Sequence, residues 1–272
     1  MSMKVFGHPI SSMHLWAILL LLIISAVSSF TLGIFPYSML ISVAASLVAE
    51  IALVKFYLKA RLRLPLSAII TGLLIGMIAP QNSPALLIIA ASFIAILSKF
   101  VIKAKHNPIF NPAAFGLIIA LAAFHAGDMW WASSSYNLSG AIVSLTPLLA
   151  VPAYLSKRIT AGLAFIITSI IIGVIMSGGL PLSTSSLISV IFSANYLLGM
   201  IMVGDPKTSP AGTKGQVAYG VLVAALLFTG GYLGMSYPIL ISLLTANLLF
   251  TLYRNKHFLL GHRLSHPKHA AQ

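Results

Sequence analysis

The chain has 272 residues, of which 59% are hydrophobic and only 7% are charged, and its mean hydropathy is +1.02. Soluble domains carry roughly 25% charged residues, so this composition excludes a water-soluble fold and predicts an integral membrane protein. The absence of cysteine excludes disulfides, iron–sulfur ligation and thiol catalysis. The net charge of +13 is spread over the turns, so we expect no nucleic acid partner.

Apolar runs long enough to cross a bilayer recur from end to end, and polar breaks divide them into about ten predicted transmembrane helices. The first run is too long for a signal-peptide core and no small-residue cleavage site follows it, so we interpret it as a retained span. A single integral membrane domain over residues 1–272 is expected. In chain order, the predicted segments are 15–35, 37–54, 66–79, 84–102, 111–125, 137–155, 159–176, 184–203, 216–234 and 236–253.

The 16 lysines and arginines lie before the first segment, after every second segment and in the tail 254–272. The other connections carry none. Because basic residues resist translocation, the sequence predicts that these turns and both termini are cytoplasmic. We therefore expect a multi-pass protein of the cell (inner) membrane, with the lipid bilayer as its first partner.

Two stretches half a chain apart are similar: "LLIGMIAPQNSP" at 73–84 and "LLGMIMVGDPKTSP" at 197–210. Five predicted spans separate them, so they point in opposite directions across the membrane. Inverted repeats with interrupted helices usually build a site near the midplane. The pattern favours one repeat over about 15–125 and a second over about 137–253. The alternative, that Gly, Pro and Ser only mark membrane loops, stays open.

The stretch "KAKHNPIFNPAAFG" at 103–116 contains two Asn-Pro pairs. Asn before Pro is a good helix start, because Asn caps free amides and Pro fits the first turn, so Asn111-Pro112 predicts one. Asn107-Pro108 suggests a second helix start one turn earlier. Two aligned starts with exposed amides would suit a phosphate, a carbonyl edge or a ring system.

Acidic residues are scarce, so each one has two interpretations. Glu50 lies inside the second predicted segment, where a carboxylate is costly unless it is paired or protonated. It either binds an ion or proton, or forms a salt bridge with Lys55 or Lys99. Asp205 either closes a turn or contacts a ligand. Asp128 lies in an outer loop with His125, and these two side chains are too few for a metal site.

Other chemistry is not indicated. The histidines lie at the boundaries of the predicted segments or outside them, which argues against paired haem ligands, and no metal is expected. No nucleotide-binding or nucleophile–base signature appears. Trp130 and Trp131 are interpreted as an interfacial aromatic belt.

Three stretches in the same order and spacing carry a family resemblance: "SAIITGLLIGMIAP", "AILSKFVIKAKHNPIFNPAAFGL" and "GMIMVGDPKTSPAGTKGQVAYG". Over roughly 65–250 the chain resembles the family of the Rnf complex D subunit and the B subunit of the sodium-translocating NADH:quinone reductase. The resemblance implies an all-α, urea-transporter-like fold of two inverted five-helix repeats. It also implies a flavoprotein subunit for electron transport coupled to ion transport. Such a subunit works with other membrane redox subunits rather than as a self-contained enzyme.

One motif of that family is broken. The family attaches FMN to the threonine of an Asp-x-x-Ser-Gly-Ala-Thr motif, but here "YNLSGAIVS" places Ile142 at that position. Isoleucine has no hydroxyl, so we predict no covalent flavin there. A non-covalent flavin, FMN or riboflavin, is the expected cofactor.

The predicted cofactor-binding residues come from the two proline-rich boxes and the interrupted helices, and Glu50 is the candidate for ion coupling. A stand-alone channel or carrier for a small polar or flavin-like solute is the alternative function. A structural subunit that only packs against redox partners is a third. The predicted flavin-binding residues are Asn107, Asn111, Asp205, Thr208, Ser209, Thr71, Gly72 and Asn195.

Overall fold

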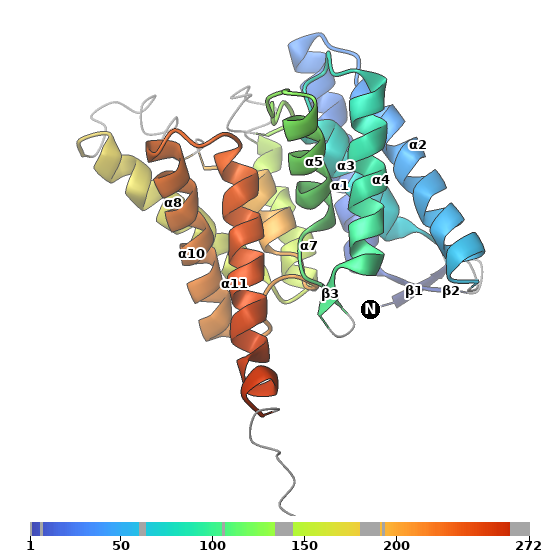
Figure 1. Cartoon of the computed structure of the whole chain (residues 1–272). Helices are drawn as coiled ribbons and strands as arrows, with labels where there is room; N and C mark the ends of the chain where they lie inside the picture. Colours follow the sequence, from blue (N-terminus) through green and yellow to red (C-terminus); the bar gives the residue numbers. More distant parts are fainter. Residues whose placement is uncertain are drawn as a thin grey trace, which may run out of the picture.

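A computed structural model provides the structure of the chain, and nearly all of its regular structure is helical (Figure 1). Two short antiparallel hairpins are the exceptions within the described residues. One pairs β1 (Ser2–Val5) with β2 (His8–Ser11), and the other pairs β3 (Lys103–Ala104) with β4 (Asn107–Pro108). The structure describes residues 2–5, 8–59, 64–104, 107–133, 144–179, 191 and 194–261.

Five helices form the first half of the chain. A π-helical turn, η1 (Leu53–Tyr57), extends the second of them. Proline precedes three of the five, which suits the first turn of a helix because proline there costs no hydrogen bond. They are α1 (Ser12–Leu32), α2 (Tyr37–Ala52), α3 (Leu66–Ile78), α4 (Ala85–Val101) and α5 (Pro112–Ala123).

The second half contains six described helical elements. A 3₁₀ turn runs directly into a short helix at its start, and its third predicted span begins within residues outside the described ranges. The elements are η2 (Thr146–Leu149), α7 (Ala150–Leu155), α8 (Ile159–Met176), the π-helical η3 (Leu198–Val203), α10 (Thr213–Tyr232) and α11 (Pro238–Gly261).

Within the described residues, four helices are long and apolar enough to cross a membrane, and five shorter apolar helices accompany them. The four are Ser12–Leu32, Tyr37–Tyr57, Ile159–Met176 and Thr213–Tyr232. Their surfaces are apolar too, as Phe30, Val48 and Ile175 illustrate by their high exposure. The expectation of an all-α multi-pass membrane protein is confirmed at this level.

Small residues let helices pack closely in both halves. A Cβ added to Gly72 would lie 2.6 Å from the Val43 Cα of α2, and one added to Gly76 would lie 2.2 Å from the Met39 Cα. A Cβ on Gly220 of α10 would lie 2.4 Å from the Ala161 carbonyl oxygen of α8. Lipid offers no hydrophobic drive between helices, so such close van der Waals contact holds them together.

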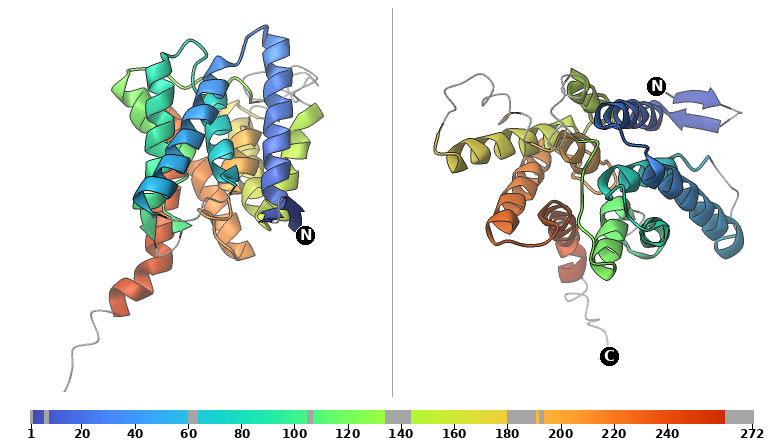
Figure 2. Two further views of the ribbon diagram at one scale, coloured as in Figure 1. Left: turned by 90° about the vertical axis from the view of Figure 1, so that its right-hand side faces the viewer. Right: turned by 90° about the horizontal axis from the view of Figure 1, so that it is seen from above.

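The neighbours of each helix follow the same scheme in the two halves. α2 packs on α3 and α4, while α8 packs on η3 and α10; α4 also packs on α5, as α10 packs on α11. Between the halves, α1 contacts α7 and α5 contacts α11. Seen from above, the two groups of helices lie side by side (Figure 2).

The described basic residues gather at one end of the molecule, which we name the basic face. η1, the end of α4, β3 and the end of α11 all lie there, as does the N-terminus (Figure 1). This arrangement agrees with the predicted clustering of cations on one side. The tail from residue 262 onward, with its histidines, lies outside the described residues.

A segment of the loop after α5 caps the C-terminal end of α3. The backbone N–H groups of Met129 and Trp130 donate to the Ile78 carbonyl oxygen at 2.8 and 3.2 Å. Trp131 donates from Nε1 to the Gly76 carbonyl oxygen at 2.8 Å. These bonds matter because an unpaired backbone group in a membrane interior costs several kcal/mol.

The interpretation of the two tryptophans as an interfacial belt is wrong. Trp130 is 4% exposed and Trp131 is 0% exposed, so both are buried in protein rather than placed against lipid. Trp130 also donates from Nε1 to Asp128 Oδ2 at 2.6 Å. Tryptophan is suited to this place because its N–H can pair while its ring fills space.

Candidate functional site

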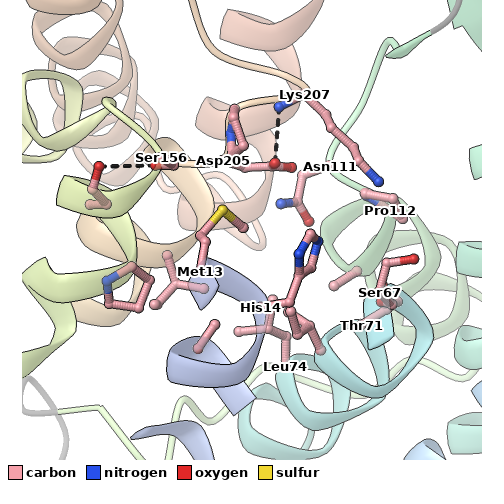
Figure 3. A pocket seen from close by; sticks show the side chains of 18 of the residues that line it. Met13, His14, Ser67, Thr71, Leu74, Asn111, Pro112, Ser156, Asp205 and Lys207 are labelled. Atoms are coloured by element: carbon pink, nitrogen blue, oxygen red, sulfur yellow. Dashed lines mark hydrogen bonds between the residues drawn. The ribbon is translucent and has the colours of Figure 1, made fainter. Parts of the chain in front are cut away.

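A cavity with an empty volume of about 830 Å³ opens at the basic face between the two halves of the chain (Figure 3). Its walls come from the starts of α1, α3 and α5 and from the ends of α4, α7 and η3. Apolar side chains such as Leu74, Met200 and Ile201 form much of the lining, and the polar groups are few. Mostly apolar cavities with a few polar groups are the usual places where proteins bind small organic molecules. We call it the basic-face cavity.

Asn111 lines this cavity and starts α5, as predicted. Its Oδ1 accepts a hydrogen bond from the Ala114 backbone N–H at 3.2 Å, and its own backbone N–H donates to Asn247 Oδ1 at 2.9 Å. Asn247 in turn donates from Nδ2 to the Tyr219 hydroxyl. Because Oδ1 is used by the cap, the Asn111 Nδ2 group is the one that can donate to a ligand.

Asn107 does not join Asn111 at the cavity. Asn107 and Pro108 form strand β4, and the backbone N–H of Ile109 donates to the Ile102 carbonyl oxygen at 3.0 Å. Asn107 is exposed, whereas Pro108 lies in the cavity wall. The prediction of two aligned helix starts is therefore wrong, because the first Asn-Pro pair belongs to a hairpin.

Asp205 enters the cavity from the opposite half of the chain. Its Oδ1 accepts from the Lys207 backbone N–H at 3.0 Å, and its Oδ2 accepts from Thr208 Oγ1 at 3.4 Å. Burial raises the pKa of the Asp205 carboxyl, and the neighbouring Lys207 acts in the other direction.

Thr208 and Ser209 hold the shape of this turn rather than line the cavity. Both are 4% exposed, and Ser209 donates from Oγ to the Asp205 carbonyl oxygen at 2.6 Å. Two prolines, Pro206 and Pro210, limit the freedom of the same turn. The turn and ligand interpretations of Asp205 are compatible. Its carboxylate accepts the hydrogen bonds that close the turn, and the same side chain lines the cavity.

The remaining predicted residues lie in three different places. Thr71 lies in the cavity wall, and its hydroxyl donates to the Ser67 carbonyl oxygen at 2.8 Å. Gly72 faces α2 and serves helix packing. Asn195 lies at the start of η3 and lines a second cavity instead. Of the eight predicted residues, the structure brings together Thr71, Asn111 and Asp205 at the basic-face cavity.

Glu50 forms an ion pair with Lys99, one of the two alternatives that the sequence left open. Both side chains are 12% exposed, and Lys99 Nζ also donates to Ser67 Oγ at 2.6 Å. Lys99 and Ser67 line the cavity, so Glu50 lies one contact behind its wall. The ion pair leaves the charge on this side of the cavity close to balanced.

Sequence reasoning missed several polar residues of the cavity. His14 projects into it from the first turn of α1, close to Asn111 in Figure 3. Ser67 and Ser156 also line it, from the start of α3 and the end of α7. His14 lies one residue before the predicted span, which begins at residue 15, and only the observed start of α1 at Ser12 shows that it is helical.

A family model described as the NQR2, RnfD, RnfE family matches residues 6–154. The chain belongs to this family. Its members are associated with membrane subunits of Rnf and Nqr complexes, in agreement with the resemblance drawn from the sequence. The match contains the Asn-Pro box and ends before the Asp205 box. No curated protein matches the chain.

Two further expectations concern the flavin-attachment position and metal binding. Ile142, at the position of the attachment threonine, lies outside the described residues. Within the described ranges, no group of three or more His, Asp or Glu residues could hold a metal ion.

Proposed function

We propose that this chain is a flavin-binding membrane subunit of an Rnf/Nqr-type electron-transport system. Family membership supports a role in such an electron-transport system, and the basic-face cavity supports flavin as the ligand. The observation that carries the proposal is that Thr71, Asn111 and Asp205, from three distant parts of the sequence, line one cavity. We place the basic face in the cytoplasm, because lysine and arginine resist translocation.

Three features of the cavity support a non-covalent flavin as the ligand. Leu74, Met200 and Ile201 give apolar surface for a ring system, and Asn111 Nδ2 offers a donor to a ring carbonyl. Asp205 offers an acceptor to a ring N–H. A flavin, when bound, accepts and releases electrons one or two at a time. The protein groups orient the ring and exclude water from it, and no side-chain nucleophile is required.

Ion coupling is assigned to Glu50 through Lys99. A negative charge gained inside the cavity attracts Lys99 and competes with Glu50 for it, because both act on the same ammonium. Glu50, released from its partner inside the membrane, then favours uptake of a proton or cation. Charge in the cavity and occupancy at Glu50 are thereby linked.

We also infer that the fold is two inverted five-helix repeats with about ten spans. The shared scheme of helix neighbours supports this, with α2, α3, α4 and α5 matching α8, η3, α10 and α11. The contacts between halves join matched elements, α1 with α7 and α5 with α11, as expected around a pseudo-twofold axis.

The absorption spectrum of the purified protein tests the proposed function. A yellow protein whose flavin bands persist in detergent, and whose flavin stays in the supernatant after acid precipitation, is the expected result. Flavin that precipitates with the protein would contradict non-covalent binding. A colourless protein that moves solute into liposomes would instead support a carrier.

A further inference from the structure

A second cavity lies at the end of the molecule opposite the basic face, and its described lining comes from the second half of the chain. It has an empty volume of about 780 Å³ and is bounded by the end of α8, the end of α10 and the start of α11. Met176 is 59% exposed and Tyr232 is 82% exposed, so the cavity opens to the surroundings between these helix ends.

Two buried polar groups in this cavity have no partner. Asn195 Nδ2 and Ser169 Oγ make no hydrogen bond, although each side chain is only 4% exposed. Buried polar groups are nearly always paired, because an unmet donor costs free energy. Both residues line the same cavity, which makes an absent acceptor the common explanation.

The orientation of Asn195 is fixed by its other contacts. Its Oδ1 accepts from the Leu198 backbone N–H at 2.9 Å and from Ser133 Oγ at 3.2 Å. A backbone N–H can only donate, so the atom facing it is the oxygen and the amide nitrogen is the free group. Asn195 therefore presents a donor, and its ligand must present an acceptor.

The rest of the lining restricts the ligand further. Among the described residues, no charged side chain lines the cavity, and the walls are apolar residues such as Leu227, Phe228 and Ile239. A charged ligand would lose its hydration without gaining a counter-charge. The occupant is therefore neutral and largely apolar.

We propose that this cavity binds a neutral, lipid-soluble molecule that presents a carbonyl oxygen to Asn195 and Ser169. The apolar body of the molecule lies between α8, α10 and α11, and the carbonyl accepts from the two unpaired groups. The site is separate from the basic-face cavity. η3 lies between the two, with Asn195 before it in one lining and Gly204 after it in the other.

Photolabelling with benzophenone, an apolar ketone, tests the proposal on the full chain in lipid nanodiscs. Irradiation should attach the probe to Met176 and to the 227–232 stretch, as read by peptide mass spectrometry. Gly231→Leu should reduce this labelling about tenfold or more, because an added Cβ meets nothing within 4 Å there and a leucine side chain can occupy the opening. Ser169→Ala should reduce it about fivefold, the effect of one hydrogen bond.

Two matched variants serve as controls. Gly212→Leu adds the same bulk just before α10, at its opposite end, also with nothing within 4 Å of the new Cβ and outside both linings. Ser46→Ala removes another buried serine hydroxyl that has no partner. Asn195 is not substituted, because its Oδ1 accepts the Leu198 backbone N–H at the start of η3.

Both controls should label like the unsubstituted protein. Equal labelling of Gly231→Leu and the unsubstituted protein, or adducts spread evenly over lipid-facing helices, would mean that the cavity holds only water and would overturn the proposal. Nanodiscs of ester and ether lipids distinguish the source of the carbonyl. Stronger labelling in ether lipids identifies a lipid ester as the natural occupant, and equal labelling identifies a free lipid-soluble carbonyl compound.

Discussion

α3 and η3 have similar sequences, yet their surroundings differ. Around α3, the Gly76 carbonyl oxygen accepts from Trp131 Nε1 and from Ser38 Oγ, at 2.8 and 2.9 Å, and the helix end is closed by backbone donors. Asn195, before η3, leaves an amide donor unpaired in one cavity, and Asp205, after η3, faces another.

The comparison shows that α3 is held in place as part of one cavity wall, whereas η3 separates two cavities. Extra hydrogen bonds and backbone contact hold α3 against α2, so α3 gives a fixed wall for the basic-face cavity. At Gly199, by contrast, the nearest atoms of α8 belong to the Phe165 and Ile166 side chains, and η3 separates two cavities. The predictions below test that contrast.

The largest effect is expected at the ion pair beside the start of α3. Lys99→Met leaves Glu50 as an uncompensated buried charge, which should lower the free energy of unfolding by about 3–5 kcal/mol. Thermal unfolding in detergent measures it. The double variant Glu50→Gln with Lys99→Met should recover most of the loss. A single variant as stable as the unsubstituted protein would show that the pair is solvated.

The next effect compares the two Gly-Met positions directly. Gly76→Ala places a Cβ 2.2 Å from a backbone atom that cannot move, and should cost about 3 kcal/mol. Gly199→Ala meets only side-chain atoms, the nearest 2.9 Å away, and should cost about 1 kcal/mol. Gly173→Ala, with open space, is the control. Equal costs at positions 76 and 199 would remove the proposed contrast.

A smaller effect is expected from the indole hydrogen bond. Trp131→Phe keeps an aromatic ring but loses the donor to Gly76, whose oxygen still accepts from Ser38. A loss of about 1 kcal/mol is predicted, the usual net worth of one hydrogen bond. Equilibrium unfolding measures it. A loss as large as that of a truncated core residue would mean that Trp131 has a further role.

The smallest effect concerns pH and the turn after η3. Burial raises the pKa of Asp205, so folding favours its neutral form. Its contribution to stability is full below the ordinary Asp pKa of about 4 and is lost as pH rises through the raised value. Asp205→Asn should remove that loss. If the unsubstituted protein instead gains stability over the variant with rising pH, Lys207 outweighs burial.

Several elements could be predicted from sequence because local signals decide them. The run 159–176 coincides with α8, since hydropathy alone marks a lipid-crossing helix. Asn111 was found as a helix cap because Asn followed by Pro acts within one turn.

The remainder depended on contacts between distant residues. Asn107 has the same local sequence signal as Asn111 but pairs into a hairpin. Trp131 resembles an interfacial tryptophan until the end of α3 supplies its acceptor. The cavity residue His14 became apparent only when the two halves were placed together.

A double-mutant cycle on riboflavin binding tests most directly whether the two proline-rich boxes form one flavin site. Riboflavin fluorescence would be titrated with the unsubstituted protein, Asn111→Ala, Asp205→Asn and the double variant. Residues that contact one ligand in one cavity should be coupled by about 0.5 kcal/mol or more. Strictly additive losses, or no saturable binding to the unsubstituted protein, would contradict the account.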